Sequence, residues 1–104
     1  MQIIPLDPVP AQNFSVLLNQ QNCQINLFQK STGLFIDLYV DSAPIVLGVI
    51  CENLNRIVRS LYLGFQGDLG FIDNQGTDDP VFTGLGTRFS LAYIPPEELP
   101  TGVG

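Results

Sequence analysis

Aspartate is the most chemically suggestive residue type in this chain, and it gathers in one short segment, Asp73–Asp79. The oxygen-bearing residues of that segment are Asp73, Asn74, Gln75, Thr77, Asp78 and Asp79. Such oxygen atoms bind calcium in other proteins, but the spacing does not match the D-x-[DN]-x-[DN]-G loop of an EF-hand, and no Glu stands at the twelfth position. Because Asp, Asn and Gly favour turns for backbone reasons, we predict a turn between two strands and no metal site.

Catalytic and cofactor-binding patterns are missing from the sequence. The chain has no His, which excludes His-based triads, His metal ligands and His proton shuttles. Glycosidase chemistry needs two carboxyl groups across a cleft, and a small chain with its acids on loops offers no evident cleft. Gly64-x-x-Gly67 and Gly84-x-Gly86 lack the Lys-Ser/Thr of a phosphate-binding loop. We therefore expect no enzymatic activity, no catalytic residue and no cofactor.

The two cysteines do not form a recognisable ligand set. Cys23 and Cys51 lie far apart, without the C-x-x-C spacing or the four ligands of a zinc site. Free cysteines are often buried and behave as small hydrophobic residues, which is the interpretation we favour. A disulfide between them is the alternative, if the chain matures outside a reducing cytosol.

Composition describes an acidic chain with few charges. It has 10 Asp and Glu against 4 Lys and Arg, a net charge of −6, and 13% charged residues, about half the usual ~25%. We expect no nucleic-acid binding, because a basic surface is absent.

Apolar residues do not indicate a membrane protein. The longest apolar run, Ile45–Cys51, has 7 residues, far short of the ~20 of a membrane helix, so no membrane insertion is expected. The N-terminus lacks a signal-peptide pattern. Ten aromatic residues in so small a chain indicate apolar surface shared with partners.

Alternation of apolar and polar residues predicts short strands throughout. In Leu34–Asp41, for example, Leu34, Ile36 and Leu38 share one face. The run Ile45–Cys51 is apolar on both sides, which predicts a strand that is central or covered by another chain. The predicted strands are Phe14–Asn19, Cys23–Lys30, Leu34–Asp41, Ile45–Cys51, Leu69–Asp73 and Thr87–Ile94.

These strands predict an all-β fold, a small antiparallel β-barrel or sandwich of six to seven strands. The segment Asn53–Leu63 is ambiguous: we interpret it as a turn entering a strand, with one short helical turn near 53–62 as the alternative. Residues 1–12 are predicted to be an extended N-terminal arm, with Gln2–Ile4 as an edge strand or docked on a neighbouring subunit. Residues 13–94 form the single β domain, and residues 95–104 a C-terminal tail.

One long stretch resembles a known family. From Arg59 to Pro80 the chain has the sequence RSLYLGFQGDLGFIDNQGTDDP, and GLGTRF follows from Gly84 to Phe89. With IIPL at Ile3–Leu6, these segments resemble the cyanophage-type baseplate plug family of contractile-tailed bacteriophages. The resemblance implies a structural protein in the virion, at the distal end of the tail near the hub and tube axis, that helps to plug or organise the tube.

The resemblance also implies partners. They would be the hub, spike and tube proteins and further copies of this chain around the tail axis, assembled in the host cytoplasm. Arginines in so acidic a chain are expected to pair with carboxylates within the subunit or across an interface. The residues that we predict for protein interaction are Ile3, Ile4, Pro5, Arg59, Tyr62, Phe65, Asp68, Asp78, Asp79 and Arg88.

Two alternatives from the sequence remain open. A head–tail connector or a tail-tube-like protein of the same virion would share the β-rich, acidic and oligomeric character. A small β-barrel that binds an apolar ligand would instead be a monomer with an interior cavity.

Overall fold

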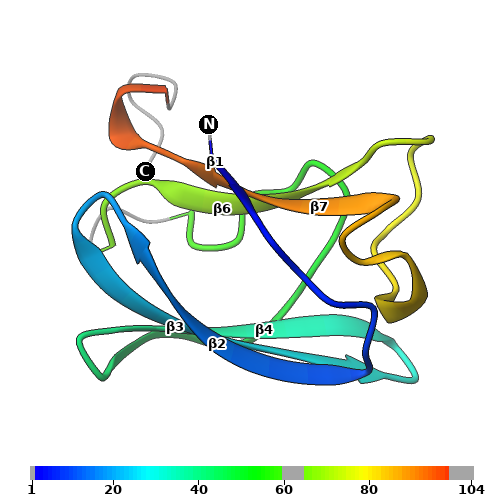
Figure 1. The fold of residues 1–104 in the computed structure, drawn as a ribbon, viewed down its shortest axis with the longest axis horizontal. Helices are drawn as coiled ribbons and strands as arrows, with labels where there is room; N and C mark the ends of the chain where they lie inside the picture. Colours follow the sequence, from blue (N-terminus) through cyan, green and yellow to red (C-terminus); the bar gives the residue numbers. More distant parts are fainter. Residues whose placement is uncertain (1, 60–64, 99–104) are drawn as a thin grey trace.

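The structure, a computed structural model, describes residues 2–59 and 65–98. Its described strands form two antiparallel sheets stacked as two layers, with β1, β6 and β7 in one layer and β2, β3 and β4 in the other (Figure 1). The predicted all-β fold is confirmed, and of the two predicted architectures the sandwich is present, since the described sheets do not close into a barrel. No helix in the described part of the chain is long and apolar enough to span a bilayer.

The larger sheet is a four-stranded meander in the order β2-β3-β4-β5. The strands are β2 (Ala11–Leu18), β3 (Gln21–Lys30), β4 (Gly33–Val40) and β5 (Ala43–Ile50). Two-residue turns join them, and Asn19, Gln20, Asp41 and Ser42 all have positive φ. Positive φ at both central residues is the geometry of tight hairpin turns that match the twist of a sheet. All three connections are therefore shorter than the sequence predicted, since β4 already begins at Gly33, and β2 begins three residues before Phe14.

The smaller sheet brings together the two ends of the chain. Its order is β1-β7-β6, with β1 (Gln2–Ile4), β6 (Asp68–Asp73) and β7 (Phe89–Ile94). Ile3 lies opposite Ala92, so Gln2–Ile4 forms an edge strand, one of the two alternatives given for the start of the chain. Two 3-10 turns, η2 (Phe82–Gly84) and η3 (Pro96–Glu98), complete the described elements.

The core lies between the sheets and follows from the period-two pattern. Leu34, Ile36 and Leu38 of β4 are fully buried, and Leu69 and Leu91 face them from the smaller sheet as members of the same apolar cluster. Burying a side chain of this kind stabilises the fold by about 1.5–3 kcal/mol. Cys23 and Cys51 belong to the same cluster as free thiols, which confirms the favoured interpretation.

Two glutamines of β3 tie the layers together at opposite ends. The side chain of Gln21 accepts from the backbone N–H of Gln66 (2.9 Å) and donates to the Gln66 carbonyl (3.1 Å). At the other end of β3, Gln29 accepts a hydrogen bond from the backbone N–H of Phe82 (3.1 Å). Because each glutamine reaches backbone of a distant segment, these bonds hold the two layers in one relative position.

Two expectations need correction. The apolar strand at Ile45–Cys51 is not central: β5 is an edge of its sheet, and Leu47 and Ile50 are 58% and 41% exposed. Of the two alternatives given for this strand, only coverage by another chain remains as a prediction. Residues 53–59 form no strand or helix, and only single bridges join Asn53 and Arg56 to β6. The rest of the ambiguous segment, residues 60–63, lies outside the described residues.

Candidate functional site

The aspartate-rich segment is organised around one arginine. Arg88, just before β7, donates from Nε to Asp73 Oδ1 (2.9 Å) and from Nη2 to Asp73 Oδ2 (2.8 Å). Its Nη2 also donates to Asp78 Oδ2 (2.8 Å). This is the two-bond pairing that the planar guanidinium favours with a carboxylate. The predicted pairing of an arginine with acids therefore occurs within the chain at Arg88.

Asp73 is the central acceptor of this cluster. Its side chain is fully buried and also accepts the backbone N–H groups of Gln75 and Asp78 (both 2.9 Å). The hydrogen bonds from Arg88, together with these two backbone bonds, hold the pKa of the Asp73 carboxyl well below its usual range, although burial acts in the opposite direction. The same pairing raises the pKa of Arg88. The segment is thus a turn closed by its own carboxylate, as predicted.

Asp79 connects this turn to a distant part of the chain. Its Oδ1 accepts the backbone N–H of Asn53 (3.0 Å), and the Asn53 side chain in turn accepts the N–H of Asp73 (2.9 Å). Within residues 2–59 and 65–98, no group of three or more acidic or Cys side chains is placed to hold a metal ion. The carboxylates here instead face N–H groups and a guanidinium.

A second buried aspartate organises the segment before β6. Asp68 is 2% exposed, and its Oδ1 accepts the N–H groups of Ile57 (3.1 Å), Val58 (2.8 Å) and its neighbour Leu69 (2.7 Å). Its Oδ2 accepts the N–H of Arg59 (2.9 Å). A buried carboxylate is tolerated because these donors replace its water. The carboxylate faces the interior, so any contact role of Asp68 acts through the segment that it holds.

The other predicted interaction residues are distributed between surface and core. Arg59 is exposed with φ of 62°, and its Nε donates to the Arg56 carbonyl (2.6 Å). Phe65 is buried, with its ring edge-on to Tyr93 at 5.8 Å. Tyr62 lies outside the described residues.

The N-terminal residues divide in the same way. Ile3 is 54% exposed and Pro5 is exposed, whereas Ile4 is buried in the core. The predicted residues therefore do not form one patch. They form two buried-aspartate clusters, around Asp68 and around Asp73 with Arg88, and an exposed edge at β1.

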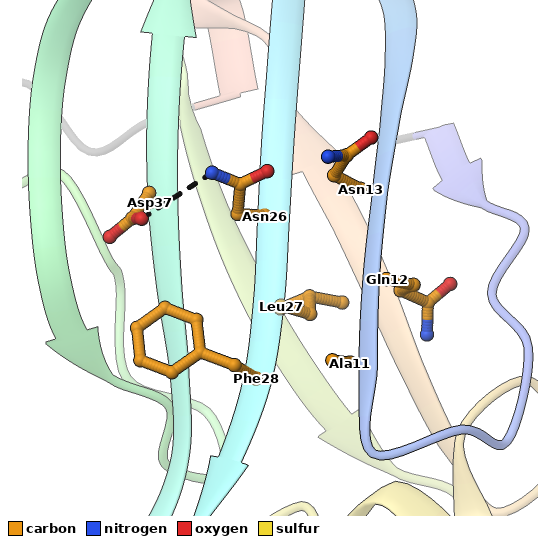
Figure 2. Close-up of a pocket in the computed structure, with 7 residues that line it drawn as sticks. All are labelled: Ala11, Gln12, Asn13, Asn26, Leu27, Phe28 and Asp37. Carbon is orange, nitrogen blue, oxygen red and sulfur yellow. Dashed lines mark hydrogen bonds between the residues drawn. The ribbon is translucent and has the colours of Figure 1, made fainter.

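The outer face of the larger sheet has a hollow that the sequence did not predict. It has a volume of about 530 Å³ and includes Asn13, Asn26 and Asp37, one from each of three adjacent strands. Figure 2 shows these side chains in a row across β2, β3 and β4. Asn26 donates to Asp37 (3.5 Å), whose other oxygen accepts the N–H of Gly48 (2.6 Å). The alternation of polar and apolar residues could have indicated that these three side chains face outward. Only the register of β2, β3 and β4 shows that they lie opposite one another.

Fold and site together define a class of protein. Asp68, Asp73 and Asp79 accept hydrogen bonds that hold loops in place. Several large apolar side chains are also exposed: Ile3, Val9, Leu17, Leu47, Ile50, Leu54 and Val81. Exposed apolar side chains on a rigid sandwich are typical of a structural interaction domain.

Comparison with known families agrees with that class. The family model described as "Cyanophage baseplate Pam3 plug gp18" matches residues 1–97. The chain therefore belongs to the cyanophage baseplate plug family, as its resemblance implied. No curated protein gives a significant match. Family membership makes the protein a structural component of a phage baseplate, located in the virion tail and interacting with other baseplate proteins.

Proposed function

We propose that the protein is a non-enzymatic component of a contractile tail that helps to plug or organise the distal end of the tail tube near the hub. The observation that carries this proposal is the match to the plug family over residues 1–97 of 104. The proposed partners are the hub, spike and tube proteins and further copies of this chain, assembled in the host cytoplasm before the tail is complete.

The hydrogen bonds that fix the loops and the two sheets support a structural role for the protein rather than a catalytic one. Asp68 and Asp73 each accept several N–H groups and fix the loops at one layer of the sandwich. Gln21 and Gln29 fix the two layers to each other. A protein that closes a tube must keep its shape while neighbouring subunits push on it, and such loops present a constant surface to those neighbours.

Charge is compatible with this position. The net charge of −6 repels the phosphates of DNA, so nucleic acid can pass near the protein without adhering to it. Direct contacts are proposed for the exposed residues Ile3, Pro5, Arg59, Asp78 and Asp79 and the partly exposed Arg88. Ile4, Phe65 and Asp68 act by supporting them, and Tyr62 remains a proposed contact.

The test is quantitative mass spectrometry of purified tails, with the copy number of this chain measured against the hub protein. A fixed small ratio supports a baseplate component at the end of the tube. A ratio that scales with tail length indicates a tube-like protein and would overturn the plug role. Absence from tails would also overturn it and direct attention to a bound apolar ligand.

A single substitution tests the contact surface within the same preparation. Arg59→Glu reverses an exposed charge whose backbone N–H, rather than its side chain, is bound by Asp68. We expect the isolated variant to fold normally and to be depleted from tails. Normal incorporation of the variant would remove Arg59 from the contact surface while leaving the copy-number result unaffected.

A further inference from the structure

The two sheets have four edge strands, and three of the four are protected against pairing with another chain. β1 has only three residues. β6 is bridged along its outer side by Asn53 and Arg56. β5 contains Pro44 and two register shifts against β4. Short length, covering segments, prolines and bulges are the usual features that keep edges from associating. Among the described residues, no strand or bridge pairs with the outer side of β2; the Gln12 side chain alone links it to the preceding segment, at the backbone of Asp7. β2 pairs with β3 over eight residues without a shift, and it contains no proline and no charge.

The ladder shows which backbone groups of β2 are open. The N–H of Gln29 donates to the carbonyl of Pro10 (2.8 Å), just before the paired residues Ala11 and Phe28. Because bonded and non-bonded pairs alternate in an antiparallel ladder, the even-numbered residues of β2 bond to β3. The odd-numbered residues therefore direct both N–H and C=O to the free side. They are Ala11, Asn13, Ser15 and Leu17, all exposed.

We propose that β2 is a dimer interface, at which a second copy adds its own β2 antiparallel to this one about a two-fold axis. Placing Ala11 opposite Leu17 and Asn13 opposite Ser15 of the second copy satisfies the open groups of all four residues on both strands. The four-stranded sheets of the two copies then form one continuous eight-stranded sheet. Phe14 and Val16 are only half-buried at the margin of the core. In this register Phe14 meets Phe14 of the second copy on the two-fold axis, and Val16 lies opposite Gln12 of the second copy.

Charge selects the second copy's β2 over the other apolar strand. No charged residue occurs from Pro8 to Gln29, so two β2 strands meet without like charges although each chain carries −6. A β5 strand paired with itself, Ala43 opposite Ile50, places Asp41 opposite Glu52 of the other copy, and like charges directly opposite destabilise a sheet. Pairing of β2 with a second copy's β5 meets the irregular backbone around Pro44 and Gly48.

The experiment is sedimentation equilibrium of the purified full chain and of two double variants. One carries Asn13→Lys with Ser15→Lys, and the other Asn13→Glu with Ser15→Glu. In either homodimer two introduced like charges face each other at both symmetric positions, so we expect the association constant to fall about tenfold or more. Mixing the two variants places Lys opposite Glu, and native mass spectrometry should then detect a heterodimer. That recovery also shows that both variants are folded.

Leu47→Lys on β5 is the matched control, since it places a charge on the other apolar edge, and it should leave the dimer intact. A wild-type chain that stays monomeric at every concentration would overturn the proposal. So would dissociation by Leu47→Lys, which indicates head-to-tail pairing, or failure of the mixed variants to associate. The proposal concerns the free protein and goes beyond the baseplate role: tails can incorporate the chain at its normal ratio even if no dimer forms.

Discussion

The two layers of the sandwich use charge in opposite ways. In the smaller sheet and its loops, Asp68, Asp73 and Arg88 are buried or partly buried, and each has several hydrogen-bonding partners. The larger sheet has an uncharged stretch from Pro8 to Gln29 and another from Ser42 to Cys51. Its edge strands expose apolar side chains such as Leu17 and Leu47.

The difference separates two tasks that one small domain must perform. Irregular loops need acceptors for their N–H groups, and a carboxylate can serve several of them at once. Regular hairpins satisfy their own backbone, so their sequence is free to favour contact with another molecule. We therefore regard the acids of the smaller sheet as the groups that fix the loops carrying the proposed baseplate contacts, and the uncharged β2 edge of the larger sheet as the surface proposed for a second copy.

The largest effect is expected from removing the acceptor of the Asp68 cluster. Asp68→Ala leaves the N–H groups of Val58 and Leu69 without their acceptor in a buried place, while the Ile57 N–H keeps its bond to the Leu69 carbonyl. The substitution should lower the free energy of unfolding by about 3 kcal/mol. Urea denaturation measures this. Asp37→Ala is the control in the other sheet. It removes the exposed bond from Gly48 and the long, 3.5 Å bond from Asn26, and water can reach this outer face, so its cost should be about 1 kcal/mol. Equal costs would remove the distinction between the layers.

Two glycines with positive φ offer a second comparison. A Cβ at Gly86 (φ 83°) would collide with the carbonyl oxygen of Leu6, whereas at Gly48 (φ 64°) it would meet nothing within 4 Å. Gly86→Ala should therefore cost about 2–3 kcal/mol, and Gly48→Ala about 1 kcal/mol from backbone strain alone. Thermal denaturation of both variants checks the difference. If Gly86→Ala is as stable as Gly48→Ala, the segment between β1 and β2 that contains Leu6 must shift at little cost in free energy.

The Asp73–Arg88 pair predicts a pH dependence. Because the folded pKa of Asp73 lies below its unfolded value of about 3.9, the ionised carboxylate stabilises the fold above that pH. The contribution is lost as the pH falls through the folded pKa. The stability advantage of the wild type over Arg88→Gln should thus shrink as the pH is lowered from about 5 to about 2. Urea midpoints measured across this range test it.

Arg59→Gln is the control for this titration. Its side chain donates to a carbonyl instead of a carboxylate, so its stability difference from the wild type should not change over the same range. An advantage over Arg88→Gln that stays constant with pH would contradict the assigned role of Asp73.

The smallest effect is expected on the outer face of the larger sheet. The Lys30 ammonium lies 5.4 Å from the ring centres of both Phe28 and Phe35, which stack on each other. Lys30→Ala should cost about 0.5 kcal/mol, the usual size of an exposed cation–π contact, and Lys30→Arg should retain most of it. Denaturation midpoints of the two variants decide the matter. If Lys30→Ala costs as much stability as Asp68→Ala, a side-chain interaction in the larger sheet is as important for the fold as those in the smaller sheet.

Most of the fold could be predicted from residue patterns, because a period of two leaves few choices for a strand with one buried face. The alternation in Cys23–Lys30 and Leu34–Asp41 predicted β3 and β4 within a residue or two, and clustered Asp, Asn and Gly predicted the turn after Asp73. The segment after Asn53 could not be predicted in this way. Its backbone follows N–H bonds to Asp68 and single bridges to β6, which depend on a strand that comes later in the chain.

The sequence by itself determined the all-β class, the acidic character, the buried cysteines and the family. Only the tertiary structure decided which strands lie at the edges, that β5 is exposed, and that Asp68 and Asp73 turn inward to hold loops. The physical reason is the range of the forces concerned. Alternation and turn preference act between neighbouring residues and are visible along the chain, whereas edge position and the acceptor of a buried N–H depend on which distant segments meet.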